Sequence, residues 1–161
     1  MALAMTVRSI GHALASSLIL VLSSGASAPH AADGPRGVAA YRVVGDGIPE
    51  PLSPMPGNAQ RGRSLIVARE AANCVLCHAV PETSLRFAGD VGPSLEGVSR
   101  RLSTAQLRLR VVDYARVSPG SAMPSYHRVE GLVNVASRYR DAPILTASEV
   151  EDVVAYLATL R

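Results

Sequence analysis

Hydrophobic positions recur most regularly in the C-terminal segment. In residues 146–161, "TASEVEDVVAYLATLR", apolar side chains are spaced by three or four residues, which is the period of one helix face. Thr146 and Glu149 have the spacing of a capping box, and the acidic residues early in the segment suit the positive end of a helix. The pattern predicts a helix whose buried face consists of Val150, Val153, Val154, Leu157 and Leu160.

A second amphipathic segment covers residues 103–116, "STAQLRLRVVDYAR". Ser103 and Gln106 again have capping-box spacing, and Pro119 is expected to end the helix because proline cannot continue a helix interior. The stripe predicted to face the core contains Leu107, Val111, Tyr114 and Ala115.

A third helix is predicted over residues 63–73, "RSLIVAREAAN". Gly62 and Ile66 lie at its start, where a small residue would let another helix approach closely. We expect Tyr156 of the C-terminal helix to pack there. These segments read as helices joined by loops.

The N-terminal apolar run has a different character. Residues 13–22, "ALASSLILVL", follow Arg8 and precede the small residues "SSGASA". A run of this length matches the core of an export signal and is too short to span a bilayer; an uncleaved anchor is the alternative. Cleavage after Ala26 fits the small-x-small pattern, whereas cleavage after Ala28 would leave a proline first. We therefore expect a signal peptide over residues 1–26, a periplasmic mature chain and no membrane attachment after cleavage.

Composition adds that the core is short of large side chains. The chain has 161 residues, 48% hydrophobic, with one Phe and no Trp, so something besides side chains could fill its middle. Without the signal peptide, which carries only Arg8, 15 basic minus 13 acidic residues leave a net charge of +2. All basic residues are arginines without interleaved aromatic residues, which argues against a nucleic-acid partner.

Both cysteines lie in "NCVLCHAV", residues 73–80, directly before His78. A structural zinc site needs about four ligands, and the rest of the mature chain offers only His30 and His127. A thioredoxin-like pair would follow a strand rather than a predicted helix. A disulfide explains Cys74 and Cys77 but leaves His78 as a coincidence.

Covalent haem attachment accounts for Cys74, Cys77 and His78 together. Two thiols at this spacing can add to the two vinyl groups of one porphyrin, and the adjacent histidine then faces the iron. The motif predicts one covalently bound haem c, which would also supply the missing core volume.

The second axial ligand is expected at Met123, in "VSPGSAMPSYHR", residues 117–128. The prolines and glycine of this segment favour a loop that could bring the thioether to the iron from the face opposite His78. A methionine that only fills the core is one alternative, and His127 is a competing ligand. Met55 precedes the haem motif and is expected to be a loop residue.

A turn-rich segment lies between the two predicted ligands. In residues 89–98, "GDVGPSLEGV", Pro93 lacks an N–H, and nearby carbonyl groups are free to accept hydrogen bonds. One of them could accept the Nδ1 proton of His78 and make that ligand more electron-rich. A loop that merely covers the haem edge is compatible with this role.

The order of helix, Cys-x-x-Cys-His, Gly-Pro loop, helix, Met-Pro loop and terminal helix resembles the class I cytochrome c fold. That resemblance covers residues 59–161 as one all-α haem domain, preceded by an irregular proline-rich arm over residues 27–58. "YRVVGDGIPEPL" in the arm and the stretch "GDVGPSLEGVSRRLSTAQLRLRVVDYARVSPGSAMPSY" are similar to the X subunit of SoxAX, a cytochrome complex of sulfur oxidation, as is the region that follows.

This resemblance implies an electron-relay role without a catalytic residue in this chain. In that family a heterodimeric partner, the SoxA subunit, carries the cysteine at which thiosulfate is joined to the carrier SoxYZ. The two electrons released pass through the X subunit to a soluble acceptor cytochrome c. By position in the motifs, Cys74 and Cys77 match the thioether cysteines, His78 the proximal ligand and Met123 the distal ligand.

The rival hypothesis is a free-standing electron shuttle. A small carrier would need neither the arm nor residues 129–143, so both extras suggest a partner interface, although ordinary surface loops would look the same. Four arginines leave similar alternatives, since they could steer an acidic partner, balance haem propionates or form a solvated helix face. They are Arg100, Arg101, Arg108 and Arg110.

Overall fold

The computed structural model describes residues 37–82, 85 and 87–161. Within these ranges the regular elements are helices, and extended pairing is limited to an isolated bridge between Val44 and Gly47. The expectation of an all-α fold is therefore confirmed. The predicted signal peptide and the first residues of the predicted arm lie outside the described residues.

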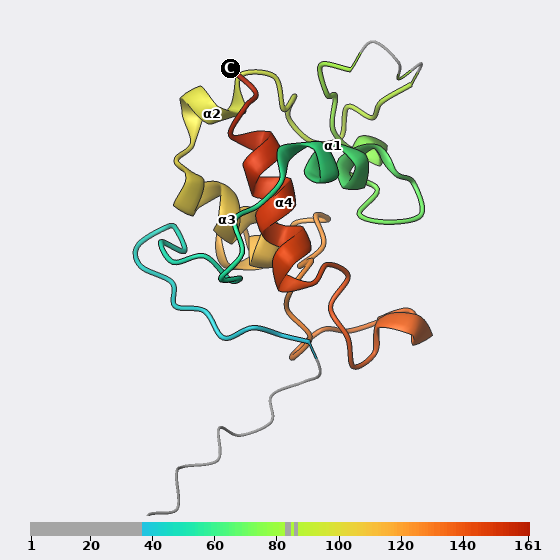
Figure 1. The fold of residues 1–161 in the computed structure, drawn as a ribbon. Coiled ribbons are helices and arrows are strands. Elements are labelled where there is room, and N and C mark those ends of the chain that lie inside the picture. The colour runs from blue at the N-terminus through green and yellow to red at the C-terminus, as the bar shows by residue number, and fades with distance from the viewer. Residues whose placement is uncertain (1–36, 83–84, 86) are drawn as a thin grey trace, which may run out of the picture. The chain divides into compact units, whose positions relative to one another are not determined.

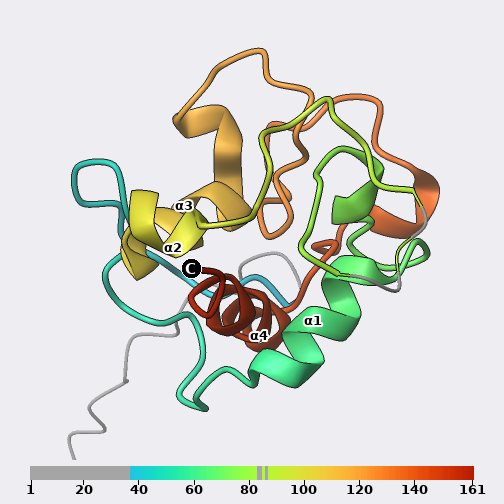
Figure 2. The same ribbon diagram turned by 90° about the horizontal axis from the view of Figure 1, so that it is seen from above.

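Helices α1 (Ala59–Val67) and α4 (Ala147–Leu157) cross in close contact, as both views of the ribbon show (Figures 1 and 2). Gly62 lies at the crossing, and a Cβ atom there would overlap the backbone carbonyl of Asp152. A bare Cα thus lets the two helices approach, as predicted. Tyr156 is buried and donates a 2.7 Å hydrogen bond to Glu82, which in turn pairs with Arg63 of α1.

The predicted caps form in both later helices. Thr146 and Glu149 exchange hydrogen bonds at the start of α4, and Ser103 and Gln106 do so at the start of α3 (Thr104–Asp113). These bonds satisfy N–H groups that a helix start leaves without partners. The predicted buried residues of the C-terminal segment are also confirmed: Val150, Val153, Val154 and Leu157 lie on α4, and Leu160 lies just beyond its end.

Helix α3 ends well before Pro119. Asp113 is its last residue, and a 3₁₀ turn, η2 (Tyr114–Arg116), follows. Tyr114 and Ala115 lie in this turn and are half-buried, so only the first two members of the predicted stripe are fully in the core. Two short elements were not predicted, α2 (Val98–Arg101) and η3 (Ser137–Tyr139).

The prediction of a helix over residues 63–73 is wrong at both ends. α1 begins after Asn58, whose side chain accepts a hydrogen bond from the N–H of Arg61, and ends at Val67. The residues that follow are good helix formers, so propensity alone would continue the helix. Instead the chain turns: Ala68 is extended, with φ of −74° and ψ of 119°, and the N–H of Asn73 bonds to the carbonyl of Ala68. Helix propensity therefore does not decide where α1 ends.

The described part of the arm is fastened to the helices by a buried ion pair. Arg108 of α3 and Glu151 of α4 lie 2.8 Å apart, Arg108 donates to the carbonyl of Ile48, and Glu151 accepts from the N–H of Leu52. A buried pair is favourable only when such further bonds satisfy its remaining polar atoms. The expectation that Arg108 belongs to a solvated or steering cluster is therefore wrong: this guanidinium holds the arm.

Candidate cofactor site

The two cysteines occupy one tight turn, η1 (Cys74–Leu76). The N–H groups of Cys77 and His78 both bond to the carbonyl of Cys74, at 3.1 and 2.9 Å. Asn73 starts the turn in the left-handed region, with φ of 53°, a conformation that asparagine tolerates better than most residues. The turn places both thiols and the imidazole on the wall of the same cavity.

That cavity has a volume of about 650 Å³, within the range of small-molecule and cofactor pockets, roughly 300–1,000 Å³. Its wall is mainly aliphatic and comes from helices α1, α3 and α4 and the loops between them. Apolar lining residues include Ile66, Leu95, Val98, Leu102, Leu107, Val111, Leu145, Val153 and Leu157. The cavity occupies space in the interior that large side chains would otherwise fill.

His78 is oriented by the loop that faces it. Its Nδ1 lies 2.7 Å from the carbonyl oxygen of Pro93, and because a carbonyl only accepts, Nδ1 carries the proton. The predicted hydrogen bond is confirmed, and it leaves Nε2 as the ring nitrogen able to bind a metal. Gly92 passes directly over the ring, since a Cβ atom at this position would overlap Cε1 and approach Nδ1 to 2.6 Å.

Met123 lines the same cavity as Cys74, Cys77 and His78. Its N–H donates a 3.1 Å hydrogen bond to the hydroxyl of Ser121, which shapes the turn ahead of it. Met55, by contrast, is 67% exposed and lies on the arm, as its assignment to a loop requires.

His127 has both ring nitrogens committed elsewhere. Its Nε2 accepts the N–H of Ala39 at 2.9 Å, and its Nδ1 lies 2.7 Å from the carbonyl of Leu145. The ring is fully buried outside the lining of the cavity. The structure thus assigns His127 to fastening the arm, not to competing with Met123.

The chemistry of Cys74 does not match that of a redox-active thiol. Burial raises the pKa of this thiol to about 11, whereas the attacking cysteine of a thioredoxin-like pair needs a lowered pKa. Both cysteines are free in the structure, so no disulfide joins them. What remains is a pair of thiols facing an apolar cavity.

Two of the four arginines singled out in the sequence bring charged groups to the wall of the cavity. Arg101 and Arg110 both line the cavity, and Arg101 is held by bonds to the carbonyls of Ser94 and Glu96, each 2.7 Å long. Sequence reasoning missed Gly92 and Asn73. The Gly-Pro pair pointed to the loop, but contact with the ring depends on the path of the whole chain.

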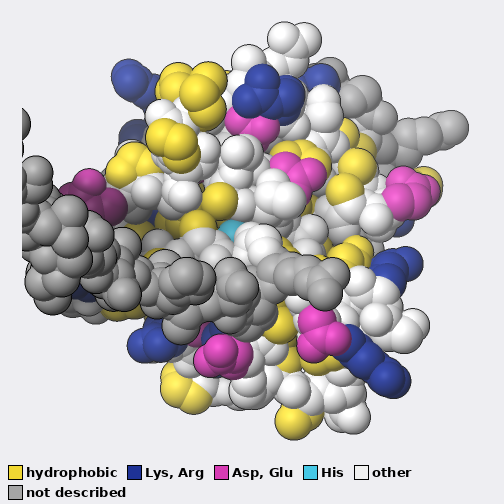
Figure 3. All heavy atoms as spheres, turned by 60° about the horizontal axis from the view of Figure 1, so that its bottom comes forward, with side chains coloured by type: hydrophobic (Ala, Val, Ile, Leu, Met, Phe, Trp, Pro, Cys, Tyr) yellow, Lys and Arg dark blue, Asp and Glu magenta, His cyan; other side chains and the backbone are white. Residues whose placement is uncertain are grey.

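Charge on the outer surface is mixed. On the face shown in Figure 3, arginine and acidic side chains are interspersed among hydrophobic ones. In the part of the chain that the structure describes, the helices are too short or too polar to cross a membrane.

Comparisons with known proteins agree with this geometry. The family model of cytochrome c matches residues 59–161. A crystal structure of SoxXA from P. pantotrophus superposes with a TM-score of 0.70 and 32% sequence identity, covering 74% of this chain and 93% of the other. No curated protein sequence matches the chain.

Proposed function

Because the chain belongs to the cytochrome c family, as a cytochrome of the SoxX type, we propose that it relays electrons within a SoxAX-like thiosulfate-oxidising complex in the periplasm. The observation that carries this proposal is the single cavity lined by both cysteines, His78 and Met123. The similarity to SoxXA supplies the partner, a SoxA-like subunit with which this chain would form a heterodimer.

The residues present fit one covalently attached haem. Cys74 and Cys77 would form its thioether bonds, and His78 Nε2 and the Met123 sulfur would be the axial ligands. Two thiols, one ring nitrogen and one thioether on an apolar wall suit this group better than a hydrated metal ion. The haem would supply one-electron chemistry, since its iron cycles between ferric and ferrous forms.

The chain's own residues tune that chemistry. The proton that His78 holds toward Pro93 gives the ring partial anionic character and makes it a stronger donor. The thioether of Met123 is neutral and favours ferrous iron, which raises the reduction potential. The aliphatic wall would exclude water from the group held in the cavity.

A relay explains the chain better than thiosulfate chemistry in its own cavity. Both cysteines would be consumed by the thioether bonds, and Met123 would close the iron position that a substrate could use. The cysteine that joins thiosulfate to a SoxYZ-like carrier is therefore expected on the SoxA-like partner. Two electrons are released per thiosulfate joined, and this chain would pass them singly to an acceptor cytochrome c.

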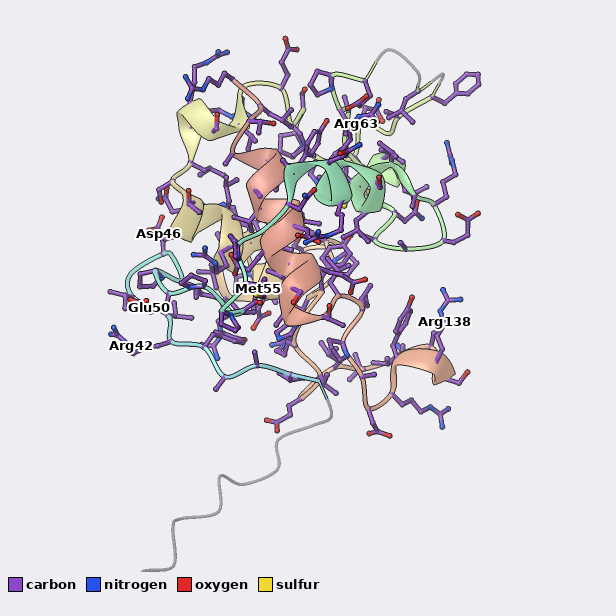
Figure 4. The ribbon with its side chains drawn as sticks, in the orientation of Figure 1. Arg42, Asp46, Glu50, Met55, Arg63 and Arg138 are labelled. Carbon is purple, nitrogen blue, oxygen red and sulfur yellow. The ribbon has the colours of Figure 1, made fainter. Side chains whose placement is uncertain are left out.

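Two surface features support contact with other proteins. Near the cysteine turn, Leu76 and Val91 are 58% and 77% exposed, a setting in which an acceptor could approach the cofactor. Elsewhere, Arg42 and Glu50 on the arm and Arg138 on η3 point outward (Figure 4). Charged side chains at the edge of a protein–protein interface affect the association rate more than the affinity.

The test combines purified components. The isolated chain should not reduce an acceptor cytochrome c with thiosulfate and a SoxYZ-like carrier, whereas addition of the SoxA-like subunit should start the reduction. Full-rate reduction by the isolated chain would overturn the proposal. Failure of the mixture with all haems intact, together with elution of the chain alone at every ionic strength, would favour the free-standing shuttle.

A further inference from the structure

Asp113 carries a fully buried carboxylate at the C-terminal end of α3. Its Oδ1 accepts a 2.7 Å hydrogen bond from the hydroxyl of Ser125, and its Oδ2 lies 3.2 Å from Arg116 Nε and 3.5 Å from Arg128 Nη1. A buried charge is costly unless it is paired and hydrogen-bonded. Its shortest bond goes to the methionine loop, not to a neighbour on α3.

Ser125 is the second residue after Met123 and begins a short fastened segment. The N–H groups of Tyr126 and His127 bond to the carbonyls of Val111 and Val112, each at 3.2 Å. The bond between Asp113 and Ser125 thus adds one more attachment of the loop to α3, one residue closer to Met123. Beyond Ser125, in the direction of Met123, Pro124 has no N–H with which to continue these attachments.

On the other side of Met123, the nearest hydrogen bond to a residue outside the loop in the described structure is at Ser118, five residues away, whose N–H bonds to the carbonyl of Tyr114 at 2.9 Å. Met123 N–H bonds to the Ser121 hydroxyl, and Ser121 N–H bonds to the carbonyl of Ser118 at 3.2 Å. Gly120, with φ of 83°, adds no side chain that could pack against the helices. The attachment at Ser125 is therefore the point from which the position of Met123 is set.

We propose that Asp113 is a positioning residue for Met123: through Ser125 it holds the methionine loop in the place from which the sulfur reaches the iron. The proposal rests on the axial role assigned to Met123 above. Loss of the Asp113–Ser125 bond should leave the fold intact and increase the fraction of molecules in which the sulfur has left the iron.

Imidazole competition on the ferric holoprotein measures that fraction. An added ligand binds only where the sulfur has left, so its apparent affinity rises in proportion to the sulfur-free population. A hydrogen bond to a charged group is lost in Ser125→Ala, and the apparent affinity for imidazole should rise about tenfold. Ser125→Thr keeps the hydroxyl and should restore the wild-type affinity. Asp113→Asn should raise the affinity in the same direction by a smaller factor, because its amide oxygen can still accept from the Ser125 hydroxyl but carries no charge.

Asp152→Asn is the matched control. Asp152 is also a buried carboxylate, in the middle of α4, with bonds to Arg61 and to the N–H of Asn58, but it joins α4 to α1 and the arm. This variant should lose global stability and keep the wild-type imidazole affinity. If Asp113 had a purely structural role, Asp113→Asn would, like Asp152→Asn, lose global stability and keep the wild-type imidazole affinity.

The outcomes separate the two proposals. If the wild-type ferric protein lacks the sulfur-to-iron absorption band, the assignment of Met123 fails and the positioning role fails with it. If the band is present and Ser125→Ala binds imidazole no more tightly than the wild type, only the positioning role of Asp113 is overturned. Should Asp113→Asn fail to mature, the imidazole affinities of Ser125→Ala and Ser125→Thr still test the positioning role.

Discussion

At the scale of single residues, two neighbours with little or no side-chain chemistry set the state of His78. Pro93 presents a carbonyl to Nδ1, and Gly92 leaves room for the ring beneath the loop. The first could be predicted, because a turn around proline leaves carbonyl groups without nearby donors. The second could not, since a glycine that avoids a ring looks the same in sequence as one that only makes a turn.

The role of Met123 gives a prediction at this scale. Met123→Leu should abolish the near-infrared sulfur-to-iron band and lower the reduction potential by on the order of 0.1 V, a fraction of the roughly 0.8 V range that axial ligands span. Met55→Leu, at the exposed methionine of the arm, should change neither. Redox titration with absorption spectroscopy measures both quantities. Retention of the band in Met123→Leu would show that another group binds the iron.

At the scale of helices, local signals and tertiary contacts can be told apart. The capping boxes at Ser103 and Thr146 depend on residues three positions away, so sequence predicts both starts correctly. The end of α1 at Val67 carries no such local signal, and prediction failed there. Arg108 was misjudged because its partner Glu151 lies on another helix.

Gly62→Ala tests the crossing itself. The added methyl would overlap the backbone of Asp152, and because a backbone carbonyl cannot move aside as a side chain can, α1 and α4 would have to separate. We expect a loss of about 1–3 kcal/mol in the free energy of unfolding, the usual cost of overpacking, although alanine is the better helix former. Chemical denaturation of the holoprotein measures it. Ser64→Ala, on the exposed side of α1, should stay within about 0.5 kcal/mol.

At the scale of the whole molecule, carboxylates bond to segments that are distant in sequence. Low pH should weaken these ion pairs and hydrogen bonds over the same range. The Arg63 guanidinium and the Tyr156 hydroxyl lower the pKa of Glu82. For Asp152, burial alone would raise the pKa, but hydrogen bonds from Arg61 and from the N–H of Asn58 outweigh it, and the pKa is lowered. A lowered carboxylate pKa stabilises the fold above the ordinary value, and the stabilisation is lost as pH falls through the folded-state value.

The free energy of unfolding should therefore decline as pH falls from about 4.5, the ordinary pKa of Glu82. In Asp152→Asn this decline should be shallower, and stability at neutral pH should be lower than in the wild type. Denaturation series at several pH values measure both slopes, and contributions from the haem cancel between the variants. Parallel slopes would mean that Asp152 does not contribute to the acid response.

The crossing of α1 with α4 also bears on when the domain can fold. A chain leaves the ribosome or an export channel from its N-terminal end, so Gly62 and both cysteines emerge well before the segment that α1 must contact. Until that segment follows, α1 has nothing to cross, and the cavity lacks the wall that Val153 and Leu157 provide. Contacts between distant parts of a chain form only after the intervening loop is available to close. Until the C-terminal segment has been made, the cysteine turn would therefore lack this part of its enclosure.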